Sequence, residues 1–526
     1  MLKLAFLIGI YSYLIYLLGL THYLRKDFII VITIAYLLIS FFYFWKKEFI
    51  KFKYYKKLKL SNFSLFIFLL LFLEAIVNLI GVLGPEISFD ALWYHLTLPK
   101  IFLQNQNLFH IPGGLLYYSD MPKLIDMFYI SSLSFGNEIL AKFIHFIFGL
   151  LTLFALYKLS RKFVSEKLAL LVVLIFYSNL VVGWESITAY IDLGRTFFEV
   201  VALYQFFIWL DKKKTINLIM AACMVGFAIS SKLVAISSIL IFIPLIALFL
   251  IRKKRHNVYI LNKILIFTLF ALLIPLPWFI FSYLNTGNPV YPFFSSSLVI
   301  SLNFSITGFV NNFFNVFDPI NPFYLIILPV VFLYYSKFDY RVKLLSIYCG
   351  LSILFWFPQS LVGGTRLLLP YLPAFSLLSI LSFNFIKSKI IKKYLLVIII
   401  LIAISSISYR FLANAKYIPY LLSQETKSQF LAKNLNFNFG DFYDTDDYFQ
   451  KNIKKSDVVL LYGFHNLYYI DFPFIDSSWV KKGDKFNYIA VQNTIIPKKF
   501  SNWKLIYYNR NTNVRLYTNN KKIWAY

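Results

Sequence analysis

Ionisable residues gather directly after an apolar stretch near the start of the chain. The segment Ser88–Lys100, SFDALWYHLTLPK, follows an apolar run that ends near Leu83. It contains Asp90, Tyr94 and His95. A carboxylate, a phenol and an imidazole are groups that transfer protons in catalysis, and ionisable groups beside an apolar layer commonly mark a functional site. The segment is therefore the first candidate for chemistry.

The same segment has a structural explanation as well. Ser88 is a suitable N-cap, and in the first turn of the helix the dipole would favour Asp90 with no catalytic role. His95 is either a satisfied interfacial side chain or a hydrogen-bond partner of a phosphate or of Asp90. Apolar residues at helical spacing predict that this helix lies on the membrane surface: Leu92, Leu96, Ile101 and Phe102.

A second group of charges lies in the segment GWESITAYIDLGR, residues 183–195. Glu185 and Asp192 are both close to apolar boundaries there. Asp192 and Arg195 are three residues apart, so they form either a structural ion pair on a helix or part of a substrate site.

Two isolated cations complete the set. Lys232 interrupts a long uncharged stretch, so its ammonium group must snorkel, pair with a carboxylate or hold an anion. Arg366 begins an apolar run in TRLLLPYLP. Its guanidinium suits bidentate phosphate contact, although snorkelling explains it equally well.

Carboxylates and cations on one membrane face suit a particular reaction. A base deprotonates an acceptor, and cations stabilise a phosphate leaving group. The residues together predict acid/base chemistry on a phosphorylated, lipid-linked substrate.

Composition indicates the elements that must position these residues. Of the 526 residues, 59% are apolar and only 14% are charged, and the mean hydropathy is +0.68, which is typical of an integral membrane protein. A helix needs about 20 apolar residues to cross the bilayer. Roughly thirteen ranges qualify, and they are 4–20, 28–45, 63–83, 138–158, 168–183, 193–210, 216–231, 233–251, 264–283, 320–335, 344–358, 366–386 and 394–409. The two ranges around Lys232 could form one long helix or a tight hairpin, and we favour the hairpin.

The net charge of +28 would favour nucleic acid in a soluble protein, but its distribution indicates a membrane orientation. Basic residues concentrate in alternate loops, including 46–59, 158–167, 252–255 and 387–393. This bias predicts a protein of the cell membrane whose N-terminus lies on the cytoplasmic side. The first large outer loop is then 84–137, and no nucleic-acid partner is expected.

The last part of the chain differs in composition. Residues 411–526 contain β-branched and aromatic runs at 457–463, 486–492, 503–508 and 514–518, separated by polar turns. These runs predict strands. We therefore expect a helical multi-span region at 1–410 and a small α/β extracytoplasmic domain at 411–526.

The order and sidedness of these motifs resemble the polytopic GT-C glycosyltransferases, including protein O-mannosyltransferases and the aminoarabinose transferases. The resemblance covers roughly 63–410, and the matching motifs are FDALWYHL, MPKLIDMFY, AYIDL, the SK of Lys232, GNPVYPFF and TRLLLPYLP. It implies a polyprenyl-phosphate sugar donor, with Asp90 as catalytic base. The mannosyltransferases carry Asp-Glu in this loop, whereas Ala91 follows Asp90 here.

Other functions and ligands stay open from the sequence. A transporter or flippase of lipid-linked saccharide would carry polar groups at the membrane midplane and inverted repeats. A non-catalytic scaffold would not explain why Asp90, Lys232 and Arg366 occur on the same membrane face. The acceptor of a transferase is a glycan, a lipid or a protein. A divalent metal ion is a further candidate if Asp90, Glu185 and His95 converge.

Overall fold

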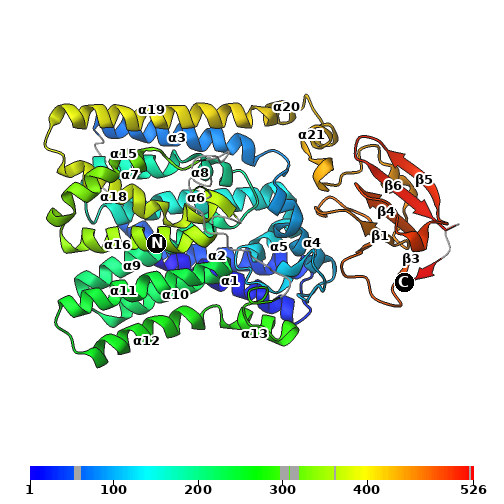
Figure 1. Ribbon diagram of the computed structural model, residues 1–526, viewed down its shortest axis with the longest axis horizontal. Helices are drawn as coiled ribbons and strands as arrows, with labels where there is room; N and C mark the ends of the chain where they lie inside the picture. The colour runs from blue at the N-terminus through cyan, green and yellow to red at the C-terminus, as the bar shows by residue number, and fades with distance from the viewer. Residues whose placement is uncertain (53–60, 296–306, 308–318, 360–362, 520–522) are drawn as a thin grey trace.

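The computed structural model describes residues 1–52, 61–295, 307, 319–359, 363–519 and 523–526. A bundle of roughly aligned helices forms most of the molecule, and a small region of strands lies beyond one end of that bundle (Figure 1). Residues 53–60 of the basic loop lie outside the described residues. The protein is thus helical with a small C-terminal sheet region, as the sequence predicts.

The helices follow the apolar pattern. All thirteen predicted ranges fall on helices, although two are interrupted: the range 168–183 after Tyr177 and the range 264–283 after Leu273. The principal helices are α1 (Leu2–Leu20), α2 (Lys26–Phe52), α3 (Asn62–Val82), α4 (Thr97–Gln104), α5 (Asp126–Phe135), α6 (Glu138–Ser160), α7 (Glu166–Tyr177), α8 (Leu180–Glu185), α9 (Asp192–Lys212), α10 (Thr215–Ser231), α11 (Ser237–Arg252), α12 (Asn257–Leu273), α13 (Leu276–Thr286), α15 (Phe323–Tyr334), α16 (Tyr340–Trp356), α18 (Leu372–Phe385), α19 (Lys389–Asn414), α20 (Ile418–Leu421), α21 (Lys427–Asn434) and α22 (Tyr448–Asn452).

Many of these helices are long enough to cross a bilayer. In the described part of the chain, eight are long and apolar enough, or nine when α12 and α13, which meet at a bend of 61°, count as one span. Pro275 lies at this bend, where its ring and missing N–H break the helical hydrogen bonding. The protein is therefore a multi-pass membrane protein.

Lys232 turns the chain between two antiparallel helices. Its backbone is extended, with φ −151° and ψ 118°, between α10 and the short helix η3 (Leu233–Ile236). Ring contacts Phe206–Phe242 and Trp209–Phe249 show that α9 and α11 run in the same direction, with α10 returning between them. The predicted hairpin is confirmed.

Basic residues meet at the end of the bundle away from the sheet. Lys162 and Arg341 both pair with Asp211, at 2.8 Å and 3.3 Å, and the Arg252 guanidinium lies 4.3 Å from the centre of the Tyr340 ring. This end corresponds to the loops expected to face the cytoplasm. The cytoplasmic location of this end stays a prediction.

The segment bearing Asp90 is helical but not surface-lying. A π-helical turn, η1 (Ala91–His95), leads into α4, and the first helical hydrogen bond runs from the Leu92 N–H to the Ser88 carbonyl at 3.1 Å. Leu92, Leu96 and Phe102 are buried within the protein. The prediction that they lie on the membrane is wrong, because helices and the C-terminal region cover them.

The C-terminal region is built on a mixed sheet. In the described residues its order is β2-β1-β4-β6-β5, with β1 parallel to β2 and β4, and β6 antiparallel to β4 and β5. The strands are β1 (Val459–Tyr462), β2 (Phe474–Asp476), β3 (Lys485–Phe486), β4 (Tyr488–Gln492), β5 (Lys504–Asn509), β6 (Val514–Thr518) and β7 (Trp524–Ala525), of which β3 and β7 pair separately. The four predicted strands correspond to β1, β4, β5 and β6. The boundary at 410/411 stays a prediction, and α19 continues past it to Asn414.

The loop after β1 fastens the sheet region to the Asp90 segment. The Tyr468 N–H donates to the Leu92 carbonyl at 3.3 Å, and the Tyr469 hydroxyl donates to the Glu86 carbonyl at 2.8 Å. His465 stacks on Phe89 with ring centres 4.7 Å apart. The C-terminal region therefore contacts the backbone on both sides of Asp90.

Candidate active site

Arg366 is the centre of a cluster of charges drawn from distant parts of the chain. It lies on the 3₁₀ helix η6 (Gly364–Tyr371), ahead of α18. Its Nη1 donates to Asp90 Oδ2 at 2.6 Å, and its Nε lies 4.0 Å from Glu185 Oε1 and 4.0 Å from Asp192 Oδ2. One guanidinium thus faces three carboxylates that the sequence analysis singled out.

Lys232 binds the third of these carboxylates. Its Nζ donates to both oxygens of Asp192, at 2.7 Å and 3.0 Å. Arg195 instead contacts the Tyr371 hydroxyl at 2.9 Å and Glu199 at 3.7 Å. The observed partner of Asp192 is therefore Lys232 and not the alternative partner Arg195.

Buried hydrogen bonds fix the backbone before Asp90. Glu86 is fully buried, and its carboxylate accepts hydrogen bonds from the Ile87 and Ser88 N–H groups, at 2.9 Å and 2.8 Å, and from the Ala189 N–H at 2.6 Å. The Asp90 N–H donates to the Tyr190 hydroxyl at 3.1 Å. The loop before η1 and the loop before α9 are thereby held together, which brings Asp90 to Arg366.

The surroundings of Asp90 keep it ionised. Burial raises the pKa of the carboxyl. The charges of Arg366 and His95 and the hydrogen bond from Arg366 lower it by a larger amount in total, so the pKa of Asp90 lies below its ordinary value. Asp90 is consequently a carboxylate held by a cation.

Glu185 is a buried carboxyl without a close partner. Its side chain is fully buried, and neither oxygen has a hydrogen-bond partner among the described residues. Burial, reinforced by the charge of Asp192, places its pKa well above the ordinary value. Glu185 therefore favours its protonated form in this structure.

Tyr94 and His95 have different positions relative to the cluster. The Tyr94 hydroxyl donates to Asp90 Oδ2 at 3.2 Å, and its ring stacks on Tyr118 with centres 3.7 Å apart. His95 is buried, and its Nδ1 lies 2.9 Å from Asp126 Oδ1. His95 thus has Asp126 as its carboxylate partner, not the Asp90 that sequence spacing suggested.

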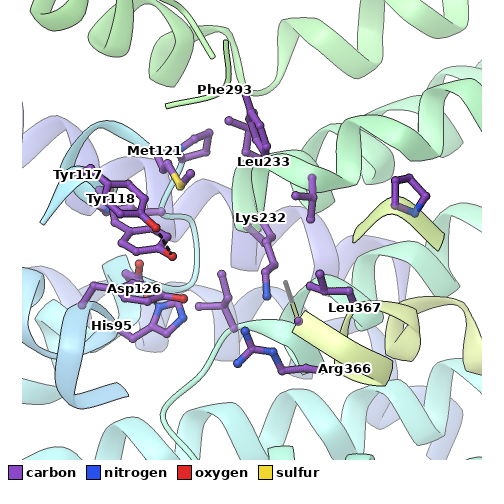
Figure 2. A pocket seen from close by; sticks show the side chains of 18 residues that line it. His95, Tyr117, Tyr118, Met121, Asp126, Lys232, Leu233, Phe293, Arg366 and Leu367 are labelled. Carbon is purple, nitrogen blue, oxygen red and sulfur yellow. Dashed lines mark hydrogen bonds and ion pairs between the residues drawn. The ribbon is translucent and has the colours of Figure 1, made fainter. Parts of the chain in front are cut away.

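A cavity of about 340 Å³ opens beside this cluster. Lys232 and Arg366 extend into it from one side, and Tyr117, Tyr118 and His95 face them (Figure 2). The rest of the wall is mainly apolar, with Met121, Pro122, Leu233, Val234, Phe293 and Leu367 among its members. Asp90 is not part of the wall, and it reaches the cavity through Arg366 and Tyr94.

Sequence reasoning did not select Lys123, Asp126, Tyr117 and Tyr118 as site residues, although Lys123 and Asp126 belong to the motif MPKLIDMFY. Lys123 is buried, which lowers the pKa of its ammonium group to about 8, and it donates to the Tyr118 carbonyl. The available signal was the charge pair in MPKLID within an otherwise apolar stretch.

The described residues contain no group of three or more His, Cys, Asp or Glu side chains arranged to hold a metal ion. Asp90, Glu185 and His95 therefore form no such group among the described residues, and the Nδ1 of His95 lies 2.9 Å from Asp126 Oδ1. The predicted metal site is not supported by this geometry.

Comparison with known proteins places this arrangement in a fold. Apo ArnT from Cupriavidus metallidurans superposes with a TM-score of 0.59 at 10% identity, covering 87% of this chain and 98% of ArnT. The same enzyme bound to undecaprenyl phosphate gives a TM-score of 0.57 at 10% identity, covering 86% and 98%. The chain has the GT-C glycosyltransferase fold. This confirms the resemblance inferred from the sequence.

A family model gives a separate match. The model described as dolichyl-phosphate-mannose-protein mannosyltransferase matches residues 127–281, a segment that includes Asp192 and Lys232. The search of curated proteins found no match to this sequence. The matched segment is similar to this mannosyltransferase family, and the chain shares its fold with ArnT.

Proposed function

We propose that this protein transfers a sugar from a polyprenyl-phosphate donor to an acceptor at the end of the bundle that carries the sheet region. Asp90 acts as general base, and Lys232 and Arg366 bind the donor phosphate. The observation that carries the proposal is the Arg366–Asp90 contact of 2.6 Å beside a cavity that both cations enter. A base and a phosphate-binding pair are thereby within one site.

The cavity suits a phosphate attached to an isoprenoid chain. Lys232 and Arg366 supply charge-assisted hydrogen bonds for phosphate oxygens, and Leu233, Val234 and Leu367 supply apolar surface next to them. The similar structure of ArnT bound to undecaprenyl phosphate supports a ligand of this class. A free nucleotide sugar would leave the apolar wall without a partner.

Donor binding would also prepare the base. In the structure Arg366 holds Asp90 as an ion pair, which makes the carboxylate a weak base. A phosphate that takes over the guanidinium removes part of this stabilisation, so the pKa of Asp90 rises toward the range useful for proton transfer. Tyr94 keeps the carboxylate oriented through its hydroxyl.

The bond changes follow from these positions. The acceptor hydroxyl oxygen attacks the anomeric carbon while Asp90 takes its proton, and the bond between that carbon and the phosphate oxygen breaks. The polyprenyl phosphate leaves with the electron pair, and Lys232 and Arg366 stabilise its added negative charge.

The test is the fate of a radiolabelled polyprenyl-phosphate sugar incubated with purified protein in bilayer nanodiscs. We expect the label to leave the lipid fraction and the polyprenyl phosphate to accumulate. In a parallel experiment with the protein in vesicles, movement of the intact donor across the bilayer without cleavage would instead identify a flippase.

A further inference from the structure

A second cleft, separate from the donor cavity, lies between the helical bundle and the C-terminal region. Its volume is about 690 Å³, within the range of pockets that bind small organic ligands. One wall comes from α4 and the loop after it, and the other comes from the segment around β2. We propose that this cleft binds a saccharide chain of the acceptor, an inference that rests on the glycosyltransferase function proposed above.

Two close contacts hold the walls of the cleft at a fixed separation. At one point, Lys100 Nζ donates to the Tyr468 and Ile470 carbonyls, at 2.7 Å and 2.8 Å, and to Asp471 at 2.6 Å. At another, a Cβ on Gly113 would lie 1.9 Å from the Ser478 carbonyl oxygen, and Gly113 has φ +87°. The cleft is therefore preformed, and its binding would not require the two regions to move apart.

The lining has the two kinds of surface that sugars need. Trp479, Phe109 and Phe474 supply aromatic surface, against which the C–H face of a pyranose ring can pack. Gln104 and His110 also line the cleft, and their polar groups can form hydrogen bonds with hydroxyls. This combination is characteristic of a surface for polar rings, and not of a groove for acyl chains.

Charged side chains exclude a lipid tail from the cleft and permit an anionic sugar. Lys455 and Lys481 both line it. Of the two lining carboxylates, Asp471 is paired with Lys100, and Asp484 accepts a hydrogen bond from the Lys481 N–H at 2.7 Å. The two lysines are thus available for a carboxylate or phosphate substituent on the saccharide.

A peptide would find few backbone partners here. β2 is one of the two edge strands of the five-stranded sheet and contributes to the lining of the cleft, but it spans only Phe474–Asp476. Pro473, immediately before it, has no N–H to donate. Strand addition depends on a row of free backbone groups, so the geometry favours a saccharide.

A short hydrogen-bonded segment connects the cleft to the donor cavity. His110, which lines the cleft, lies 2.7 Å from Asp120 through its Nδ1, and Asp120 also accepts from Ser119 at 2.7 Å. Asp120 ends the helix η2 (Tyr117–Asp120), whose first two residues line the donor cavity. One loop therefore contributes residues to both sites, and donor and acceptor subsites of a transferase must be near each other.

The test is equilibrium binding of three tetrasaccharides to the full-length protein in nanodiscs without donor. The probes are maltotetraose, chitotetraose and tetragalacturonate, which represent neutral, N-acetylated and anionic sugars. We expect at least one to bind, and Trp479→Ala to weaken that binding about tenfold or more through lost aromatic contact. Trp479→Phe should retain part of the affinity, and Gln104→Ala, from the opposite wall, should also weaken binding.

Matched controls separate the cleft from general effects. Tyr508 is an aromatic residue of β5 with 44% exposure outside the cleft lining, so Tyr508→Ala should bind like the natural protein. If the anionic probe is the ligand, Lys481→Gln should weaken binding while the exposed neighbour change Lys482→Gln should not.

Three results would overturn the inference. They are no binding of any probe at concentrations on the order of 10 mM, where even very weak complexes form, equal affinities in the Trp479→Ala and Tyr508→Ala variants, and binding of a Ser/Thr-rich peptide in place of all three saccharides. The binding assay contains no donor, so its outcome does not depend on the transfer test described above. Saccharide binding together with no release of label in that transfer test would contradict only the proposed function. Transfer without saccharide binding would contradict only the cleft.

Discussion

Replacing Asp90 with Asn should tighten binding of the donor phosphate even though it removes the base. In the structure Asp90 occupies the Arg366 guanidinium at 2.6 Å, and the two side chains are only 15% and 18% exposed. A phosphate must displace this carboxylate, so a neutral amide competes less. The interaction free energy between neighbouring charges in such partly buried sites is about 1 kcal/mol. The donor Kd of Asp90→Asn should therefore be about fivefold lower than that of the natural protein.

Removing either cation should have the opposite effect. Arg366→Ala and Lys232→Ala each delete a charged hydrogen bond worth about 1.5–3 kcal/mol, which corresponds to about a 10- to 150-fold weaker Kd. Arg366→Lys should also weaken binding, because an ammonium group cannot form the bidentate contact of a guanidinium. Arg341, which pairs with Asp211 at the other end of the bundle, provides the matched Arg→Ala control.

The assay is titration of a short-chain polyprenyl phosphate against each variant in nanodiscs, so no turnover is involved. The expected order of affinity is Asp90→Asn above the natural protein, and Arg366→Ala and Lys232→Ala below it. Weaker binding by Asp90→Asn, or unchanged binding by both alanine variants, would refute a phosphate site at Arg366 and Lys232.

Three further predictions concern positioning, stability and orientation. Glu86→Gln should lower kcat while leaving the donor Kd nearly unchanged, because Glu86 holds the backbone before Asp90. The half-buried Glu166, at the start of α7, provides the matched Glu→Gln control, and a change in Kd alone would contradict this role. Burial raises the pKa of Asp476 from 3.8 to about 6, so the ionised carboxylate destabilises the fold as the pH rises through this interval. Above about pH 6, Asp476→Asn should therefore increase the free energy of unfolding by up to about 3 kcal/mol and raise Tm, whereas near pH 4 it should change neither. Equal effects at both pH values would count against this prediction. In a cysteine-free background, a cysteine at exposed Asn105 should react with a membrane-impermeant thiol reagent in intact cells and one at Lys254 only after lysis, and the reverse pattern would invert the predicted orientation.

The sequence predicts the helices well because their length is fixed by the thickness of the bilayer. It also predicts that Asp90, Lys232 and Arg366 share one end of the bundle, since alternation of loops determines which segments lie together. Their mutual contacts were not predictable. Arg366 and Asp90 are 276 residues apart in sequence, and only tertiary packing selects this pairing from the available carboxylates.

The details that the sequence did not predict are contacts between distant segments. Asp126 is the partner of His95 across 31 residues, and Glu86 binds the Ala189 N–H across 103 residues. Neither has a periodic or motif signature. The surface location expected for Leu92 was wrong because helical spacing shows which side chains are apolar but not whether lipid or protein covers them.

The most direct test of the central claim is turnover of Asp90→Asn at saturating donor and acceptor. Asn preserves the size of the side chain but has no basicity, so kcat should fall about 100-fold or more while donor binding persists. Asp211→Asn, which removes a carboxylate at the other end of the bundle, should leave kcat near that of the natural protein. A kcat for Asp90→Asn close to that of the natural protein would contradict the assignment of Asp90 as the catalytic base.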